Sequence, residues 1–449
     1  MSKKEKIIII ITTVICVLAL ISISTFFIYK SIKDKKAKKP QTTLDMAQFA
    51  EYEEDSFGFV RPEGAYGVMK DANVHWSRPY PGPFIWGQME KQKGQYDFGE
   101  TDSYVKKAQE NGVVLLATIW PYAEWDQTVC HEKLDPKIVK DFPQLGEYRQ
   151  NPCDMEAYKN FIKQMVERYD GDGMNDMPDL KYPVKYWELN NQPDIDWDNR
   201  PEGYIAVLKA TYESLKSADN GSKVLNGGIS SLTDRNLLFW KKVLGEGSAY
   251  IDIVAMNAPQ DLNLQPLLSF MKEIKNEKPI WLTSIQFGIA SNSASEKGIS
   301  EEKWSEYLVE SYIQALGSGV KKLFYFGVDN TSPSAQTALV VNCKKDNESS
   351  SSGSTNVTDS NGCPKQKMFD AYKTMVKKLD NFDRIEQIAE GQYRFYHGDK
   401  STYVVWKGRI PNSLVENVRL TDVFGNEYIR NASDLTDFNA PLYVEDIEN

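Results

Sequence analysis

Hydrophobic residues in this chain recur with two spacings, and the two kinds of segment alternate along most of the sequence. Short apolar runs rich in Val, Ile and aromatic residues, bounded by polar turns, predict β-strands. Eight such runs occur, at residues 56–60, 74–78, 113–119, 184–189, 224–229, 251–256, 279–283 and 322–326. Strands that alternate with helical segments predict a parallel sheet whose strands are joined by helices.

The clearest helical pattern lies in residues 155–169, where apolar residues recur at steps of three and four and Lys and Glu occupy the opposite face. Similar patterns predict helices at residues 204–218, 236–244, 264–276, 300–316 and 367–379. Repeated strand–helix units with eight strands predict the α/β class and a (β/α)8 TIM barrel over residues 55–382. A doubly wound open sheet is the alternative, but no glycine-rich phosphate loop follows an early strand.

The two ends of the chain depart from this pattern. Residues 7–29 form an uncharged, mostly apolar run that is long enough to span a bilayer, so residues 1–29 are predicted to be a single transmembrane anchor. The charged residues 30–54 lack periodicity and predict a juxtamembrane linker. From residue 383 onward, apolar and polar residues alternate between Gly and Asn turns, which predicts a small C-terminal β-sandwich over residues 383–449.

The lysines and the cysteines predict opposite orientations for the anchor. Lysines flank the apolar run on both sides, and the heavier cluster at residues 30–39 would keep the large domain in the cytoplasm. The cysteines favour the opposite side, because local pairs that bracket polar loops are typical of disulfides in an oxidising compartment. The two expected disulfides join Cys130 to Cys153 and Cys343 to Cys363. We expect a single-pass membrane protein with its large domain outside the cytoplasm.

Composition narrows the possible partners. The net charge of −10 disfavours a nucleic-acid partner, and the three His residues are too widely spaced for a His-based metal site. An acidic stretch at residues 170–179 partly matches a calcium-loop rhythm, but Arg168 stands at the first loop position, so a plain acidic turn is the preferred interpretation. No metal or cofactor is therefore expected. The chain is rich in Trp and Tyr, which suit both protein cores and sugar-stacking surfaces.

Three motifs carry a family resemblance. They are "WGQMEKQKGQYDFGETDSYVKKAQENGVVLLATI" at residues 86–119, "VKYWELNNQPD" at residues 184–194 and "KPIWLTSIQFG" at residues 278–288. Together with the β-rich tail, they resemble the clan A glycoside hydrolases, a group of (β/α)8-barrel enzymes, in the neighbourhood of families 39, 42 and 5. The resemblance extends over about residues 55–449 and implies a carbohydrate ligand, an oligo- or polysaccharide.

The resemblance also implies binding residues at the ends of the strands. Arg78 matches the arginine on the second strand that supports the catalytic pocket, and Asn191 matches the asparagine that contacts the sugar 2-hydroxyl. Asn257 stands where the sixth strand often carries His or Tyr. Aromatic residues at strand ends are further candidates for sugar stacking, although most barrel aromatics pack against helices. These residues are Trp76, Trp86, Trp120, Tyr122, Trp125, Trp197 and Tyr325.

Both catalytic positions that the resemblance implies hold neutral residues. Gln192 stands where the acid/base glutamate is expected, and Ser284 stands where the nucleophilic glutamate is expected. If the seventh strand shifts in register by two residues, Gln286 takes the nucleophile's place. Retaining hydrolysis requires two carboxyl groups about 5 Å apart. A glutamine has no dissociable proton near neutral pH, and a serine is a poor nucleophile without a neighbouring base.

Other carboxylates in the sequence are candidates to replace the two missing catalytic glutamates. Glu188 lies on the same strand face as Gln192 but deeper in the barrel, and we expect it to pair with an Arg or Lys in the interior. Acidic residues in the loops after the third and fourth strands are further candidates. These are Glu124, Asp126, Asp194, Asp196 and Asp198.

Three functions follow from these residues. The first is a catalytically degenerate, membrane-anchored glycoside-hydrolase-like protein, a pseudoenzyme that binds a glycan or a partner at the cell surface. The second is an active O-glycosyl hydrolase or transglycosidase that uses displaced carboxylates. The third is a surface scaffold with no ligand in the barrel. The sequence does not decide whether the protein is an enzyme, and it names neither the sugar nor the linkage.

Overall fold

Eight parallel strands form the centre of the computed structural model, which describes residues 44–140, 142–196, 200–257, 264–287, 299–328, 337–340, 364–409, 414, 417–435 and 438–447. The strands are β1 (Phe57–Val60), β2 (Trp76–Arg78), β5 (Val114–Ile119), β6 (Tyr186–Leu189), β7 (Lys223–Leu225), β8 (Val254–Asn257), β9 (Ile280–Ile285) and β10 (Val320–Tyr325). All eight predicted strands are confirmed in position, with small shifts at their ends.

The strands close into a barrel. Their order is β7-β6-β5-β2-β1-β10-β9-β8, so β7 and β8 are the two ends of the hydrogen-bonded sheet. Parallel bridges between Leu225 and Ile253 and between Ile229 and Met256 join these two ends. The (β/α)8 barrel is therefore confirmed, and the open-sheet alternative is wrong.

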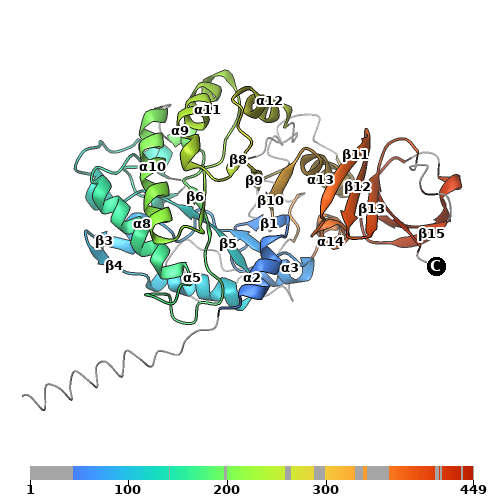
Figure 1. Cartoon of the computed structure of the whole chain (residues 1–449), viewed down its shortest axis with the longest axis horizontal. Coiled ribbons are helices and arrows are strands. Elements are labelled where there is room, and N and C mark those ends of the chain that lie inside the picture. Colours follow the sequence, from blue (N-terminus) through green and yellow to red (C-terminus); the bar gives the residue numbers. More distant parts are fainter. Residues whose placement is uncertain are drawn as a thin grey trace, which may run out of the picture. The chain divides into compact units, whose positions relative to one another are not determined.

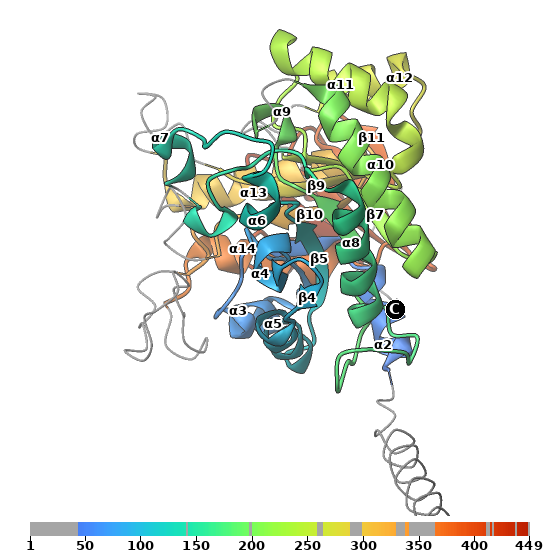
Figure 2. The ribbon, with the colours of Figure 1, turned by 90° about the vertical axis from the view of Figure 1, so that its left-hand side faces the viewer.

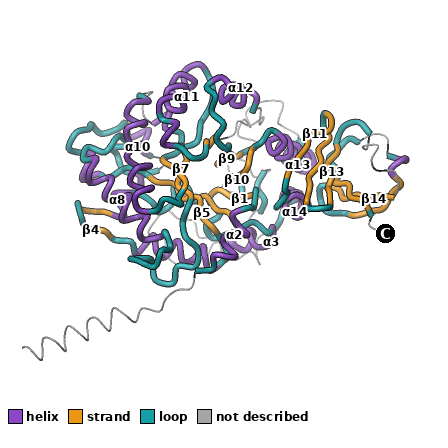
Figure 3. Tube along the Cα trace, viewed as in Figure 1, coloured by secondary structure: helices purple, strands orange, loops and turns teal. Residues whose placement is uncertain are grey.

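One longer helix follows each barrel strand. These helices are α3 (Tyr66–Ala72), α5 (Gly99–Glu110), α8 (Met155–Tyr169), α10 (Pro201–Ala218), α11 (Asp234–Glu246), α12 (Gln265–Glu273), α13 (Glu301–Gly317) and α14 (Lys367–Leu379). Figures 1 and 3 show the strands at the centre and helices around them. Helix α8 illustrates the cause, because it buries Tyr158, Phe161 and Met165 while the Asp154 side chain caps its first turn.

Short elements occupy the connections between strands and helices. They are the helices α4 (Trp86–Met89), α6 (Glu124–Gln127), α7 (Pro136–Val139) and α9 (Pro193–Asp196), the hairpin strands β3 (Glu90–Gln92) and β4 (Gln95–Tyr96), and the 3-10 turns at Pro143–Leu145 and Ser248–Tyr250. Helices α6, α7 and α9 all follow the carboxyl end of a strand. In a (β/α)8 barrel, functional sites are built from the loops at this end.

The barrel interior has an aromatic layer beneath a polar one. Side chains two residues apart on a strand point to the same face, so each interior aromatic residue is followed by an interior polar one. The rings of Trp76, Tyr186 and Trp281 pack with centroids 5.0 to 5.6 Å apart. The residues two positions later are Arg78, Glu188 and Thr283, which are all buried. The polar layer thus lies between the aromatic layer and the carboxyl ends of the strands.

A helix closes the amino-terminal end of the barrel. Residues 46–53, which the sequence assigned to a linker, form helix α2 (Met46–Glu53), so that part of the linker prediction is wrong. Phe49 and Tyr52 of α2 are buried against the interior aromatic layer. The Trp76 indole N–H donates to the Tyr52 carbonyl at 2.6 Å. Tertiary contacts stabilise this helix, which is too short to be stable on its own.

The C-terminal residues form one antiparallel sheet of six strands in the order β11-β12-β13-β16-β14-β15. The strands are β11 (Arg384–Ala389), β12 (Gln392–His397), β13 (Lys400–Val405), β14 (Asn417–Asp422), β15 (Glu427–Asn431) and β16 (Leu442–Asp446). Lys378 of α14 connects the barrel to this sheet through ion pairs to Glu427 at 3.3 Å and Glu445 at 2.8 Å. The antiparallel strands of the predicted C-terminal β-sandwich are confirmed, and those in the described residues belong to a single sheet.

Two predictions about the N-terminus and the cysteines have separate outcomes. Within the described part of the chain, no helix has the length and apolarity needed to cross a membrane. The predicted anchor at residues 7–29 lies outside the described residues. The Cys130–Cys153 disulfide is confirmed, with Cα atoms 6.0 Å apart. The predicted Cys343–Cys363 pair also lies outside the described residues.

Candidate functional site

A buried ion pair lies in the polar layer at the carboxyl end of the strands. Arg78, at the end of β2, donates from Nε to the carboxylate of Glu188 on β6, and both side chains are at most 1% exposed. Thr283 on β9 donates its hydroxyl proton to the other oxygen of the same carboxylate at 2.7 Å. Burial raises the pKa of Glu188, whereas the positive charge of Arg78 opposes that rise. The prediction that Glu188 pairs with an interior cation is confirmed.

Two asparagines extend this network toward the mouth of the barrel, which is the end formed by the carboxyl ends of the strands and the loops that follow them. The Asn191 side-chain oxygen Oδ1 accepts from Arg78 Nη2 at 2.9 Å and from Asn257 Nδ2 at 3.1 Å. Asn191 also donates from Nδ2 to the Tyr80 hydroxyl at 3.3 Å. The structure therefore brings Arg78, Asn191 and Asn257, which are far apart in the sequence, into one hydrogen-bonded group.

The backbone after β6 holds Asn191 in place. Asn190 and Gln192, on either side of it, have φ angles of 68° and 53°, in the left-handed region that asparagine adopts more readily than most residues. The Gln192 N–H donates to the carbonyl of Gly227, which follows β7. A Cβ at position 227 would collide with the Leu189 carbonyl, so this close approach of two strand ends requires glycine. Gln192 is thus fixed through its backbone at the strand end.

Ser284 and Gln286 lie at the carboxyl end of β9, as the sequence predicted. Ser284 pairs with Asn257 of β8, and the pairing shifts in register at that point. Ser284 and Gln286 are both half-buried. The Gln286 side-chain nitrogen is buried and has no hydrogen-bond acceptor among the described residues. An unsatisfied buried donor costs about 1–3 kcal/mol, a cost that a ligand oxygen can remove.

Two of the carboxylates that are candidates to replace the catalytic glutamates form hydrogen bonds within the protein. Asp194 of α9 is buried and accepts from Asn236 at 2.5 Å and from the Ser230 hydroxyl. Burial raises the pKa of Asp194, and these hydrogen bonds oppose that rise. Asp126 is also buried, and its two oxygens accept the backbone N–H groups of Cys153 at 2.7 Å and Asp154 at 2.8 Å. Both carboxylates therefore stabilise loops.

The remaining acidic candidates are Glu124, Asp196 and Asp198. Glu124 begins helix α6 and is exposed. The side chain of Asp196 and all of Asp198 lie outside the described residues.

Comparisons with known proteins agree with the barrel and its β tail. No protein-family profile and no curated protein sequence matches the chain. A solved family 39 glycoside hydrolase from the gut symbiont Bacteroides cellulosilyticus WH2 has 16% sequence identity to this chain. It superimposes with a TM-score of 0.57 over 88% of this chain and 81% of its own. The chain has the fold of a clan A glycoside hydrolase.

Two further solved structures show the same likeness. A family 39 β-xylosidase from Caulobacter crescentus has 14% identity and a TM-score of 0.56, over 85% of this chain and 91% of its own. A glucosidase from Croceicoccus marinus has 12% identity and a TM-score of 0.53, over 88% of this chain and 96% of its own. At identities this low, the structural likeness establishes the glycoside-hydrolase-like fold alone. Activity and ligand have to be argued from the residues of the site.

Most aromatic residues that the sequence nominated are core residues of this fold. Trp120 is buried and donates its indole N–H to the Pro81 carbonyl at 2.6 Å, and Tyr325 is buried and donates its hydroxyl to Thr337. Trp76, Trp86 and Tyr122 are buried as well. Trp125 is half-buried and donates its indole N–H to the Glu90 backbone carbonyl at 2.6 Å. Trp197 lies outside the described residues. A stacking role for Trp120 or Tyr325 stays a prediction, and both rings are buried.

The half-buried aromatics around Arg78 are residues that the sequence reasoning missed. They are Tyr80, Phe142 and Phe326. Tyr80 follows Arg78 by two residues, and the strand period would have placed it at the mouth. No local pattern marks Phe142, because its position depends on how a long loop folds.

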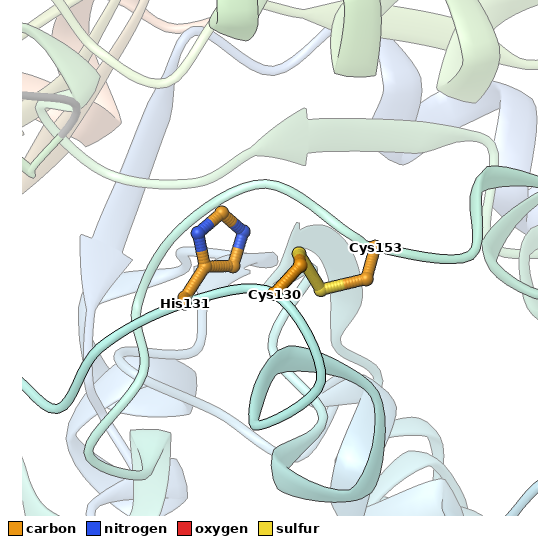
Figure 4. A group of neighbouring side chains, drawn as sticks. All are labelled: Cys130, His131 and Cys153. Carbon is orange, nitrogen blue, oxygen red and sulfur yellow. A yellow bond between two sulfur atoms is a disulfide. The ribbon is translucent and has the colours of Figure 1, made fainter.

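Two groups of potential metal ligands lie apart from this network. Cys130, His131 and Cys153 lie close together, as Figure 4 shows, but the two sulfur atoms form the disulfide and are not thiolate ligands. The carboxylates of Asp170 and Asp172 lie near that of Asp176 in the turn after α8, which is at the amino-terminal end of the barrel. Burial raises the pKa of Asp170 to about 7.

Proposed function

We propose that the chain binds a glycan at the mouth of the barrel and does not hydrolyse it. The mouth offers a dense set of neutral hydrogen-bonding groups, the amides of Asn191, Gln192, Asn257 and Gln286, beside the compensated charge of Arg78. Paired amide donors and acceptors suit the hydroxyl groups of a sugar. The site residues Gln192 and Ser284 would stand where an active relative holds its two glutamates.

One observation carries this proposal. Three of the candidate carboxylates accept hydrogen bonds from the protein itself: Glu188 from Arg78 and Thr283, Asp194 through one oxygen from Ser230 and Asn236, and Asp126 from backbone N–H groups. A general acid must reach the glycosidic oxygen with a proton, and a nucleophile must reach the anomeric carbon. Carboxylates held in this way support binding more than bond cleavage.

The solved structures suggest a sugar class with which to begin. Their names include a β-xylosidase, a glucosidase and an endoxylanase from Clostridium papyrosolvens C71, which has 11% identity and a TM-score of 0.53. We propose β-linked xylo- or gluco-oligosaccharides as the ligand class. Isothermal titration of the full chain in detergent with xylotetraose and cellotetraose tests this. Saturable binding to either is expected, whereas a flat titration across a wide polysaccharide panel would overturn the glycan proposal.

A second candidate function is hydrolysis with a displaced acid, and Asp194 is the residue that favours it. It lies two positions after Gln192, and burial raises its pKa in the direction that a general acid requires. Turnover of aryl β-xyloside or β-glucoside that disappears in Asp194→Asn and survives in Gln192→Ala would establish this function. Asp219→Asn is the control, because Asp219 is also a hydrogen-bonded carboxylate, bound by Lys185 at 2.7 Å, but it precedes β7 at the amino-terminal end of the barrel.

We also propose that residues 7–29 anchor the protein in a membrane with the barrel outside the cytoplasm. The Cys130–Cys153 disulfide supports this side, because disulfides persist in oxidising compartments. Labelling of intact cells with a membrane-impermeant amine reagent is expected to modify barrel lysines. Labelling that appears only after lysis would place the barrel in the cytoplasm.

A further inference from the structure

Three half-buried aromatic rings meet beside the asparagine network. Tyr80 packs edge-on against Phe142 with centroids 5.2 Å apart and against Phe326 at 6.5 Å. The Arg78 guanidinium lies 5.4 Å from the centre of the Tyr80 ring. Large aromatics elsewhere in the barrel, such as Trp76 and Trp187, are fully buried. The partial exposure of these three rings therefore sets the mouth apart from the rest of the barrel interior.

Phe142 reaches this position from the long loop between β5 and α8. The Cys130–Cys153 disulfide fastens one end of the loop to the start of α8. Inside the loop, Arg149 is buried and donates to the carbonyls of Phe142 at 2.6 Å, Val139 at 3.0 Å and Gly146 at 3.2 Å. A single buried guanidinium thus organises the turn that presents Phe142.

The loop is also fixed to the barrel at its base. The Asp126 carboxylate accepts hydrogen bonds from the backbone N–H groups of Cys153 and Asp154, at the end of the loop where α8 begins. The His131 ring bonds the Asn151 carbonyl at 2.7 Å. Figure 2 shows α7 of this loop on the side of the barrel opposite α2. These contacts hold the described residues of the loop around Phe142 in place.

A short series of contacts joins Phe142 to the groups that are expected to hold the sugar. Phe142 packs on Tyr80, and the Tyr80 hydroxyl accepts from Asn191. Asn191 in turn bonds Arg78 and Asn257. A pyranose that bonds these amides through its hydroxyl groups would have its apolar C–H surface beside Tyr80 and Phe142. Aromatic rings pack favourably on such surfaces.

We propose that the disulfide-closed loop supplies an aromatic wall to the glycan site, with Phe142 as a specificity-determining residue that packs on the C–H face of a pyranose. The inference rests on the proposed function and deepens it, because it assigns part of the site to a loop outside the family motifs. Tyr80 forms the base of the wall, and Arg149 and the disulfide hold the wall in position.

Titration of the full chain with the oligosaccharide that binds more tightly, xylotetraose or cellotetraose, tests this wall. Phe142→Ala is expected to weaken binding about tenfold, and Phe142→Tyr to retain most of the affinity because it keeps the ring face. Phe382→Ala is the matched control, because Phe382 is also half-buried and packs edge-on against Phe395 at the same centroid distance of 5.2 Å. Phe382 lies between α14 and β11, and its substitution is expected to leave affinity unchanged.

The outcomes separate this inference from the function on which it rests. If the wild type binds and Phe142→Ala binds equally well, the wall is overturned and glycan binding stands. If Phe142→Ala and Phe382→Ala weaken binding equally, the effect is a general loss of packing, and the wall is again overturned. If the wild type binds no oligosaccharide, the proposed function fails and the wall fails with it. Melting temperatures of all variants verify that each is folded.

Discussion

The two ends of the barrel bury charge in different ways. At the amino-terminal end, the Lys322 ammonium lies 4.2 Å from the centre of the Trp76 ring and donates to backbone carbonyls of Glu53 and Asp55, beneath helix α2. At the carboxyl end, Arg78 pairs with Glu188 and also bonds Asn191, near half-buried aromatic rings. The first end is sealed by the chain's own helix, whereas the second carries amides and half-buried rings that we propose contact a ligand.

This difference separates stability from binding. Polar groups at the sealed end donate to backbone carbonyls of α2 and of Asp55 just after it, so changes there should alter the stability of the fold. At the mouth, the Gln286 side-chain nitrogen has no acceptor among the described residues, so changes at this end should alter ligand affinity as well as stability. The rule that functional sites of barrels lie at the carboxyl ends of the strands agrees with this division.

Removal of α2 should have the largest effect. A chain that begins at residue 55 would expose the aromatic layer that Phe49 and Tyr52 cover and would leave the Trp76 N–H without its acceptor. The expected loss is about 5 kcal/mol or more, enough to unfold many domains. Thermal unfolding followed by circular dichroism measures it, with a chain that begins at residue 44 as the control. Equal melting temperatures for the two chains would show that α2 does not seal the barrel.

Breaking the ion pair at the mouth comes next. Arg78→Leu leaves the buried Glu188 carboxylate without its cation, and the expected loss is about 3–5 kcal/mol. The double variant Arg78→Leu, Glu188→Leu removes both charges and should recover much of that stability. Chemical denaturation of the two variants and the wild type measures these differences. A double variant no more stable than Arg78→Leu would contradict this account of the pair.

These predictions also show where sequence reasoning succeeded. The strands and longer helices were predictable because burial on both faces of a parallel barrel produces short continuous apolar runs. The partner of Glu188 was predictable because residues two apart on a strand share a face. Helix α2 was missed because only Phe49 and Tyr52 of its eight residues are buried in a charged segment. Its stability comes from contacts with distant strands.

The burial of most of the nominated aromatic residues has a related reason. A tryptophan or tyrosine at a strand end points into the mouth or into the helical layer, depending on strand register and local twist. Trp120 and Tyr325 face the core. Phe142 could not be found, since its place depends on a disulfide and on Arg149, neither of which leaves a periodic pattern.

Opening the disulfide should have a moderate effect, confined to the mouth. In the double variant Cys130→Ser, Cys153→Ser, a loop with a sequence separation of 23 residues is no longer closed, and stability should fall by about 3 kcal/mol. The account further predicts that affinity for the bound oligosaccharide falls about as much as in Phe142→Ala. Parallel denaturation and titration measure both quantities. Unchanged affinity with reduced stability would show that the disulfide does not position Phe142.

The smallest effect is expected from the acidic turn at the amino-terminal end of the barrel. Burial raises the pKa of Asp170 to about 7, so the folded chain keeps this proton at pH values where the unfolded chain has lost it. Ionisation of Asp170 therefore lowers stability as the pH rises from about 4 to above 7. Asp170→Asn should raise the melting temperature by about 1–2 °C at pH 8.5 and have little effect at pH 4.

Asp172→Asn is the control for this change, because Asp172 is exposed and its removal takes away the same charge. Differential scanning fluorimetry in the presence of a chelator measures both variants. A larger effect of Asp170→Asn at pH 4 than at pH 8.5 would reverse the predicted sign.

The central claim is that the mouth holds a sugar without cleaving it. The most direct measurement combines calorimetric titration of the full chain with xylotetraose and cellotetraose and chromatographic analysis of the same samples after prolonged incubation. The account predicts saturable binding of at least one oligosaccharide and its full recovery. Release of shorter sugars that stops in Asp194→Asn would contradict it and show that a displaced carboxylate restores hydrolysis.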